Sequence, residues 1–206
     1  MRTEILAAAQ HIIRTQGMDA LSLRAIAKAV GVTAPALYEY FDSKDAILRG
    51  LFVQGAELML SLVDEQVASR PPGIETLREI LHGYRQFARD EPDYFRLLFG
   101  TVDPALALTE VDYQPMQAIF ERFAGLIAAS IELGELQPLP VMTLSCALWA
   151  LIHGAAMLET DSFIARKKHD GEETGPSFDA AVHLTLLNFA TLKGAEMIGP
   201  LDDDCM

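Results

Sequence analysis

A short stretch near the N-terminus carries side chains that could bind a phosphate backbone. Thr33, Tyr38 and Tyr40 each have a hydroxyl that can donate a hydrogen bond to a phosphate oxygen. The residues after Thr33 are the small Ala34, Pro35 and Ala36, which allow the chain to approach base edges closely. Because a helix N-terminus carries partial positive charge, a helix beginning here would favour an anionic partner. This spacing predicts contact with nucleic acid.

Two short helices are expected to position these side chains. The first helix ends at Gly31, and the second begins after Thr33, which can cap it. Glycine permits the backbone conformation of a tight turn, and small apolar residues let two helices cross closely. The pair therefore predicts a helix-turn-helix, in which the N-terminal end of the second helix lies in the major groove. Its inward-facing residues are expected to be Leu23, Ile26, Ala27, Val30, Leu37 and Phe41.

The rest of the chain is also expected to be helical, because alternating strand patterns and hairpin turns are nearly absent. A first helix ending at Gly17 has Ile5, Leu6, Ala9, Ile12 and Ile13 on one face. Ser43 can cap a fourth helix, whose apolar stripe is Ile47, Leu48, Leu51, Phe52, Leu58, Met59, Leu62 and Val63. Further helices are expected near 74–89, 92–99, 104–133, 140–160 and 178–197, and residues 166–177 read as a solvated loop. The fold class is therefore all-α.

The segment from Leu21 to Leu48, LSLRAIAKAVGVTAPALYEYFDSKDAIL, resembles the DNA-binding region of the TetR family of transcriptional repressors. The matching elements are Gly31-Val32-Thr33, the run from Leu37 to Phe41, and Ser43-Lys44 before an apolar pair. The resemblance implies a three-helix DNA-binding domain at 1–46, a helical ligand-binding and dimerisation domain at 47–197, and an acidic tail at 198–206. It also implies a double-stranded DNA operator as the partner.

The resemblance assigns DNA-binding roles to individual residues. The residues at phosphate-contacting positions are Thr33, Tyr38, Tyr40 and Lys44, and those facing bases are Ala34, Pro35 and Ala36. The residues close to the backbone at the groove edge are Ser22, Arg24 and Lys28. Glu39 is interpreted as solvent-facing, because phosphates repel a carboxylate. Taken singly, the two tyrosines could instead be ordinary, partly buried aromatics, and Lys44 an ordinary solvated cation.

The C-terminal part resembles a subgroup whose C-terminal domain carries a Trp…His-Gly motif, here Trp149 and His153-Gly154. This implies a homodimer, with the helices near 140–160 and 178–197 forming a four-helix interface. The uncharged run from Leu139 to Leu158 fits a helix buried between its own core and a partner better than a membrane span. The residues expected to line a pocket for an unknown small effector are Tyr84, Phe87, Phe95, Phe99, Met116, Phe120, Phe123, Trp149, His153 and Met157. Core packing is the alternative for each of them.

No catalytic, metal-binding or cofactor-binding motif stands out. The chain lacks a His-Glu-x-x-His pair, a phosphate-binding glycine loop and a Gly-x-Ser-x-Gly elbow. Cys146 and Cys205 read as reduced thiols, and the charged N-terminus does not resemble a secretion signal, so we expect a cytoplasmic protein. The expected function is a ligand-controlled transcriptional repressor acting by a shift between two dimer arrangements. The alternative is a helical small-molecule-binding or enzymatic domain whose DNA-binding motif is no longer functional.

The charge distribution is compatible with a DNA partner, although the chain has a formal net charge of −13. Residues 1–49 contain six Lys or Arg and five Asp or Glu, whereas residues 50–206 contain ten and 24. The acidity is therefore concentrated outside the expected DNA-binding region, where it would repel DNA. Because that region is itself only weakly basic, binding would depend on two copies acting together.

Overall fold

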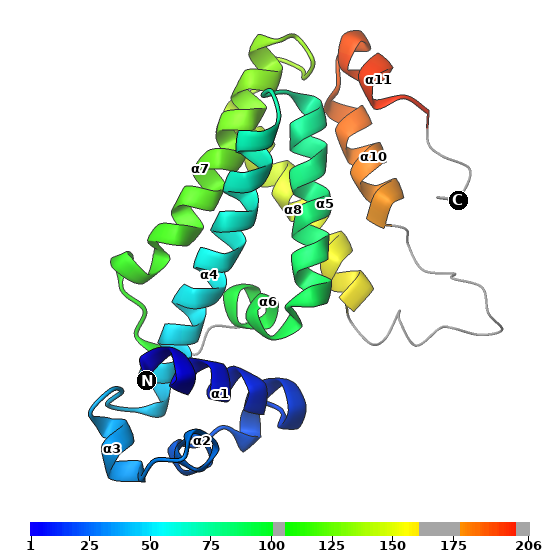
Figure 1. The fold of residues 1–206 in the computed structure, drawn as a ribbon. Helices are drawn as coiled ribbons and strands as arrows, with labels where there is room; N and C mark the ends of the chain where they lie inside the picture. Colours follow the sequence, from blue (N-terminus) through cyan, green and yellow to red (C-terminus); the bar gives the residue numbers. More distant parts are fainter. Residues whose placement is uncertain (101–105, 161–177, 201–206) are drawn as a thin grey trace, which may run out of the picture. The chain divides into compact units, whose positions relative to one another are not determined.

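The computed structural model describes residues 1–100, 106–160 and 178–200, and in these ranges the chain is helical without a β-strand. This confirms the all-α prediction. Figure 1 shows the helices, which are α1 (Arg2–Gln16), α2 (Leu23–Val30), α3 (Ala34–Tyr38), α4 (Lys44–Ser69), α5 (Ile74–Asp90), α6 (Pro92–Phe99), α7 (Glu110–Glu132), α8 (Val141–Thr160), α10 (Phe178–Phe189) and α11 (Leu192–Ile198). A 3₁₀ turn, Met18–Ala20, separates α1 from α2.

Three details of the sequence interpretation are corrected. The helix expected at 104–133 begins at Glu110, and residues 101–105 lie outside the described ranges, as do the predicted loop at 166–177 and Cys205. The helix expected at 178–197 is two helices, α10 and α11, separated at Ala190–Thr191. In α4, Leu58 and Leu62 are 36% and 41% exposed rather than on the buried stripe.

The structure divides into two compact units, which we describe separately. Unit 1 contains residues 1–59 and 91–117, and unit 2 contains residues 60–90 and 118–206. Helices α4 and α7 each contribute residues to both units.

The core of unit 1 is built from the apolar faces that the sequence predicts. Ile5 and Ile12 of α1 are buried, as are Ile26 of α2 and Leu37 of α3. Phe41, after α3, is only 3% exposed. The spacing of these residues is helical, so each short helix gains most of its stability by covering its neighbours.

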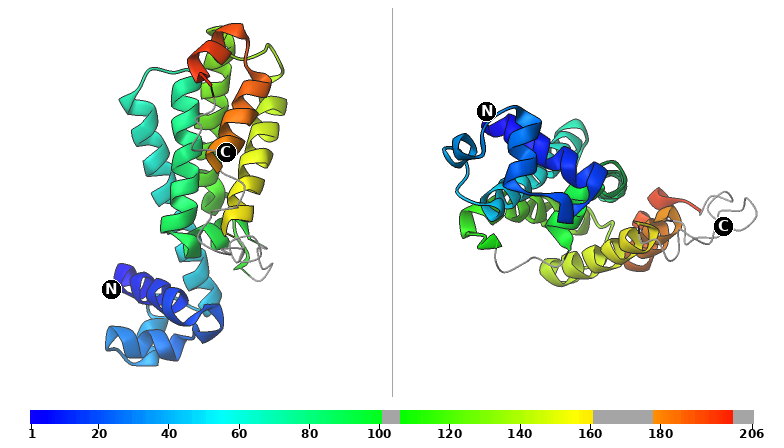
Figure 2. Two further views of the ribbon diagram at one scale, coloured as in Figure 1. Left: turned by 90° about the vertical axis from the view of Figure 1, so that its right-hand side faces the viewer. Right: turned by 90° about the horizontal axis from the view of Figure 1, so that it is seen from below.

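In unit 2, α5, α8 and α10 lie side by side (Figure 2). The turn between α7 and α8 is joined to the break between α10 and α11. The Thr191 N–H donates to the Glu135 carbonyl at 2.9 Å, and Leu136 pairs with Ala190 in an isolated β-bridge. The Glu135 carboxylate, which is buried, accepts from the Ile74 N–H at 2.8 Å and so caps the start of α5. The hydrogen bonds that Thr191 and Gln137 donate across this junction explain why α10 ends at Phe189.

Two helices, α4 and α8, are long and apolar enough to cross a membrane by length and composition alone. Helices of soluble all-α proteins also pass this test when they are covered by other helices. Several apolar side chains of α8 are exposed in the protomer, among them Leu151 and Leu158.

Candidate nucleic-acid interface

Helix α2 has well-formed ends. The Ser22 Oγ accepts a hydrogen bond from the Ala25 N–H at 3.2 Å, which caps its N-terminus. At the C-terminus, Gly31 has a φ of +73°, a left-handed conformation that other residues adopt only with strain. The Val32 N–H then donates to the Ala27 carbonyl at 3.0 Å. This confirms the tight turn expected at Gly31.

Helix α3 begins as the sequence predicts. The Thr33 Oγ1 accepts from the Ala36 N–H at 3.4 Å, and Pro35 lies in the first turn, where its missing N–H costs nothing. Leu37 is fully buried and anchors the helix to the core. Since the capping oxygens of Ser22 and Thr33 are acceptors in these bonds, their hydroxyl hydrogens remain able to donate to a phosphate.

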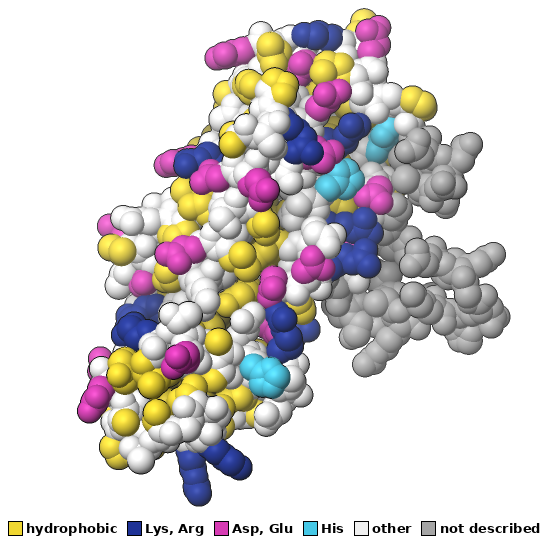
Figure 3. Space-filling view, in the orientation of Figure 1, with side chains coloured by type: hydrophobic (Ala, Val, Ile, Leu, Met, Phe, Trp, Pro, Cys, Tyr) yellow, Lys and Arg dark blue, Asp and Glu magenta, His cyan; other side chains and the backbone are white. Residues whose placement is uncertain are grey.

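The side chains predicted to contact DNA lie on the outside of α2 and α3. Tyr38, the last residue of the five-residue helix α3, is 52% exposed. Lys or Arg side chains project in Figure 3 from the end of unit 1 that α2 occupies in Figure 1. The exposed members of the predicted set are Ser22, Arg24, Lys28, Thr33, Pro35 and Tyr38, whereas Ala34, Ala36, Tyr40 and Lys44 are half-buried. Glu39 is exposed, as expected.

Sequence reasoning missed a residue that supports this surface, Arg2 of α1. Its guanidinium lies over the Phe41 ring, 4.2 Å from the ring centroid, and donates a hydrogen bond to the Tyr40 carbonyl. The contact fixes the turn after α3 against the start of α1. Because Arg2 and Tyr40 are 38 positions apart in the sequence, no local sequence pattern could have predicted this contact.

The turn after α3 ends in a third capped helix. The Ser43 Oγ accepts from the Ala46 N–H at 3.0 Å, which confirms the predicted cap of α4. Lys44 is the first residue of α4 and lies close in sequence to Tyr40. The three caps, at Ser22, Thr33 and Ser43, orient three helix N-termini, and each N-terminus can attract an anion.

The ten residues predicted to line an effector pocket are divided between the two units. Phe95, Phe99 and Met116 belong to unit 1, and the Phe95 and Phe99 rings lie 5.0 Å apart. The other seven, Tyr84, Phe87, Phe120, Phe123, Trp149, His153 and Met157, belong to unit 2. Phe87, Phe95 and Phe123 are buried.

Three of the predicted pocket residues in unit 2 contact one another. The Tyr84 hydroxyl lies 2.7 Å from His153 Nδ1, and Trp149 stacks on the His153 ring with centroids 5.4 Å apart. Burial raises the pKa of Tyr84 and lowers the pKa of His153, so at neutral pH the phenol keeps its proton and the imidazole is uncharged. The tyrosine therefore donates to Nδ1, and the imidazole proton is on Nε2. The Trp…His-Gly motif thus joins α8 to α5.

An ion-pair network that sequence reasoning did not identify follows Tyr84. The Arg85 guanidinium donates to the Glu159 carboxylate at distances down to 2.6 Å and to Asp179 at 3.1 Å. These bonds, mainly the one to Glu159, raise the pKa of Arg85. Arg85 therefore ties the end of α8 and the start of α10 to α5.

Family models match both parts of the chain. Residues 5–51 match the model described as bacterial regulatory proteins, tetR family. Residues 77–185, more than half of the chain, match the model described as tetracyclin repressor-like, C-terminal domain. The first match covers the helix-turn-helix described above, and the second covers α5 to most of α10.

Individual relatives agree with the family models. The nucleoid occlusion factor SlmA of Haemophilus influenzae is 29% identical over 120 residues, which are 58% of this chain and 54% of that protein. The chain thus spans about half the length of the SlmA proteins it matches first. An uncharacterized HTH-type transcriptional regulator, YobS of Bacillus subtilis, is 25% identical over 82% of this chain and 81% of its own. A solved structure of a protein of unknown function from Rhodococcus sp. RHA1 has the same fold, with a TM-score of 0.77, 21% identity, and coverage of 92% of this chain and 95% of that one.

Proposed function

The chain belongs to the TetR family of bacterial regulatory proteins, and on this premise we propose that it is a homodimeric, DNA-binding transcriptional repressor released from its operator by a small apolar ligand. The observation that carries the proposal is the helix pair α2 and α3, joined at Gly31, with polar side chains on its outer surface. We assign DNA binding to residues 1–46, ligand binding and dimerisation to 47–197, and no binding role to the acidic tail at 198–206.

The proposed DNA contacts follow from which side chains are accessible. The base-facing positions, Ala34 to Ala36, are small enough for α3 to enter the major groove closely. Tyr38 and the capping hydroxyl of Thr33 would donate to phosphates on one side of the groove. Arg24 and Lys28 on α2 would lie along the backbone at its edge. Tyr40 and Lys44 complete the set at the turn into α4.

The proposed dimer interface lies on α8 and α10. Leu151 and Leu158 of α8 are 52% and 47% exposed, and Leu184 of α10 is 57% exposed. Gly154 lies between the two α8 leucines, and a Cβ added there would meet nothing within 4 Å in the protomer. One side of α8 carries residues spaced at intervals of four, three and four, namely Ala147, Leu151, Gly154 and Leu158. A second copy would cover this side, with the small glycine allowing close helix contact.

The proposed effector site lies in unit 2, at Tyr84, Trp149 and His153. The three side chains combine a flat aromatic surface with polar atoms, as small-molecule sites usually do. The neighbouring Arg85 network ties the ends of α8 and α10 to α5, so a ligand that moved α5 would also move two helices of the proposed dimer interface. The change that it causes in DNA affinity would be limited by the ratio of its affinities for the two dimer arrangements.

We further propose that the protein is cytoplasmic and has no catalytic role, since members of its family act as regulators. The competing interpretation is a helical small-molecule-binding or enzymatic domain whose DNA-binding motif has lost its function. No observation on the described residues favours it, because the exposed hydroxyls and basic side chains of α2 and α3 are retained.

The test is direct selection of DNA by the full chain. Random duplexes retained by the protein should converge on a palindrome whose half-sites are one helical turn, roughly 34–36 Å, apart. Footprinting on the selected sequence should protect both half-sites. If no sequence is enriched over a mock selection at low salt, the repressor proposal is wrong, and the competing interpretation takes its place.

A further inference from the structure

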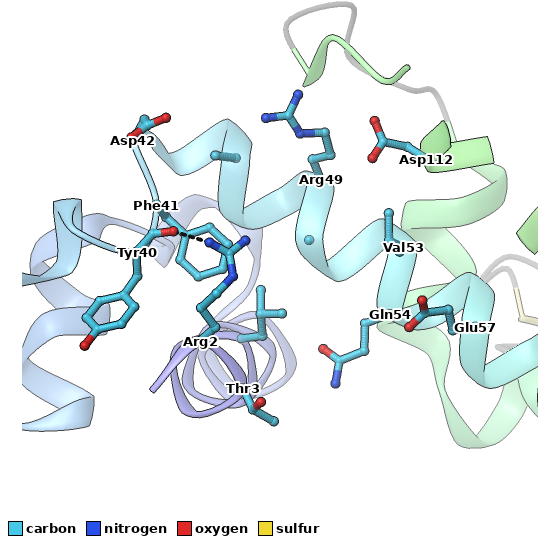
Figure 4. Close-up of a pocket in the computed structure, with 13 residues that line it drawn as sticks. Arg2, Thr3, Tyr40, Phe41, Asp42, Arg49, Val53, Gln54, Glu57 and Asp112 are labelled. Atoms are coloured by element: carbon cyan, nitrogen blue, oxygen red, sulfur yellow. Dashed lines mark hydrogen bonds between the residues drawn. The ribbon is translucent and has the colours of Figure 1, made fainter. Parts of the chain in front are cut away.

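Unit 1 contains a cavity that neither the DNA surface nor the proposed effector site uses. Its volume is about 490 Å³, within the range of small-molecule sites. It lies between the first turns of α1, the turn after α3, residues 46–57 of α4 and Asp112 of α7 (Figure 4). The lining is largely polar, with both arginines and carboxylates, so its occupant must be a polar molecule.

One end of the cavity has an arginine available to an anion. Arg49 of α4 is half-buried and forms no ion pair or hydrogen bond within the described ranges. Its nearest acid, Asp112, is occupied instead by Thr109, whose N–H and hydroxyl donate to the carboxylate at 2.8 and 2.7 Å. The Thr109 N–H lowers the pKa of Asp112 most, and Arg49 contributes a weaker attraction. A half-buried guanidinium without a direct partner is suited to bind a carboxylate.

The other end of the cavity offers hydrogen-bond acceptors. The Gln54 Oε1 is buried and has no hydrogen-bond donor among the residues that the structure describes. A buried acceptor without a donor is costly, and this cost favours a rotation of the Gln54 amide that turns Oε1 into the cavity, where a ligand can donate to it. Glu57, three residues later on the same helix, adds a carboxylate that forms no ion pair in the described structure. An ammonium group satisfies both acceptors.

The two ends are separated by an apolar wall. Leu6, Phe41 and Val53 are apolar residues of the lining, and the Arg2 guanidinium lies over the Phe41 ring. Gly50 lets α1 approach α4 here, because a Cβ at this position would lie 3.0 Å from a Leu6 methyl carbon. The rise of an α-helix places Gln54 roughly 7.5 Å, and Glu57 roughly 12 Å, along the axis from Arg49. A ligand spanning the cavity therefore needs an apolar chain of this length between its charged ends.

We propose that this cavity binds a small zwitterion, with its carboxylate at Arg49 and its ammonium at Gln54 and Glu57. A simple anion fits less well, because the three carboxylates in the lining, Asp42, Glu57 and Asp112, outnumber the two arginines. A simple cation would leave Arg49 without a counter-charge. Only a molecule with both charges pairs both ends.

The site is placed to influence the DNA surface. Its lining includes Tyr40, whose carbonyl accepts from Arg2, and Arg2 also lines the cavity. A ligand held between α1 and α4 would therefore restrict the turn that carries Tyr40 and leads to Lys44. This effect on DNA rests on the proposed function, whereas binding of the zwitterion does not.

The test uses three probes that differ only in their charged ends: 6-aminohexanoate, hexanoate and hexylamine. The charged groups of 6-aminohexanoate are roughly 7 Å apart when extended, which matches the axial distance from Arg49 to Gln54. Calorimetric titration of the full chain should give a dissociation constant on the order of 1 mM for this zwitterion, typical of a ligand this small. Hexanoate and hexylamine should each bind at least about tenfold more weakly.

Two variants assign the two ends of the site. Arg49→Gln should weaken binding of 6-aminohexanoate about tenfold and leave hexylamine unchanged, whereas Gln54→Leu should weaken the zwitterion and leave hexanoate unchanged. Arg96→Gln, which removes an exposed arginine of α6 in the same unit, is the matched control and should change nothing. Circular dichroism checks that each variant is folded, and the probe comparison on the unmodified chain stands without the variants.

Three results would overturn the proposal. They are equal affinity for hexanoate and the zwitterion, no heat from any probe up to roughly 20 mM, and unchanged zwitterion binding by a folded Arg49→Gln. Because these titrations contain no DNA, their outcome is independent of the operator selection. A separate titration of operator DNA with and without 6-aminohexanoate then measures whether the site is coupled to DNA binding.

Discussion

The helix pair α2–α3 and the helix pair α8–α10 differ in how their exposed side chains are explained. In α2–α3, Ile26, Ala27 and Leu37 are buried within unit 1, the other large aliphatic residues are half-buried, and the exposed large aromatic, Tyr38, carries a hydroxyl. In α8–α10, large apolar side chains such as Leu151 and Leu184 remain more than half exposed. The first pair is therefore complete within one protomer and presents a surface to a polar partner. The second pair requires an apolar partner, which we propose to be a second copy of the chain.

The largest expected effect comes from disrupting the proposed dimer contact of the α8–α10 pair. Gly154→Leu places a large side chain on the proposed contact side of α8, where an added Cβ meets nothing within 4 Å in the protomer. The protomer should fold, but the dimer should dissociate to monomers in sedimentation velocity at micromolar concentration. Operator affinity should fall about 100-fold or more, because two half-sites are then bound independently.

Gly125→Leu is the control for this substitution. Gly125 is also a helical glycine, in α7, it is exposed, and an added Cβ there meets nothing within 4 Å. This variant should remain a dimer with unchanged operator affinity. A dimeric Gly154→Leu would move the interface away from this side of α8.

A smaller loss of DNA affinity is expected from a substitution on the exposed surface of the α2–α3 pair. Tyr38→Phe removes one exposed hydroxyl and leaves the buried residues of α3 unchanged. Loss of a hydrogen bond to a charged phosphate costs about 1.5 kcal/mol or more at each half-site, so affinity for a duplex that carries a single half-site should fall roughly tenfold in a fluorescence anisotropy titration. Tyr113→Phe, at another exposed tyrosine of unit 1, should not change it. Equal affinities for the two variants would remove Tyr38 from the proposed interface.

Lys44→Ala tests the electrostatic part of the same surface. Losing one phosphate contact at each of the two half-sites should reduce the slope of log affinity against log salt concentration by roughly 1.8, with a similar loss for all DNA sequences. Arg78→Ala, which removes a basic side chain of α5, should leave the slope as it was. If both variants change the slope equally, the effect reflects total charge rather than a contact at Lys44.

The sequence predicted the first pair better than the second because the determinants of the first are local. The caps at Thr33 and Ser43 join residues three positions apart, and the turn depends on Gly31 alone. These determinants lie within one turn of helix, so a short window contains all of them.

The determinants that the sequence did not reveal join distant residues. The break after Phe189 depends on the bond from Thr191 to the Glu135 carbonyl, whereas the apolar spacing on either side continues as in one helix. The contact of Arg2 with the Tyr40 carbonyl likewise depends on how α1 meets the turn after α3. Local periodicity does not encode such pairings, and for the same reason it could not assign the ten predicted pocket residues to two units.

The smallest expected effect sharpens the comparison within unit 2, where His153 joins α8 to α5. Its pKa is lowered in the folded protein by burial, so below the ordinary value of about 6.5 the unfolded chain binds the proton more readily. The contribution of His153 to the free energy of unfolding is therefore fully present above about pH 6.5. It decreases as the pH drops towards the folded pKa, by at most about 1.4 kcal/mol per pH unit. A proton on Nδ1 would also end the hydrogen bond that it accepts from Tyr84.

Urea denaturation of His153→Gln between pH 5 and pH 8, at one protomer concentration, measures this contribution as a difference from the unmodified chain. The difference removes the contribution of the nearby Arg85 network and of the remaining histidines, since both proteins contain them. The substitution should lower stability at pH 8, because Tyr84 loses its partner, and the deficit should shrink as the pH falls. A deficit for His153→Gln that is constant with pH would mean that burial does not lower the pKa of this imidazole. A deficit that grows on acidification would mean that the folded protein stabilises the charged imidazole, so that the Trp…His-Gly motif is held by a cation rather than by a neutral acceptor.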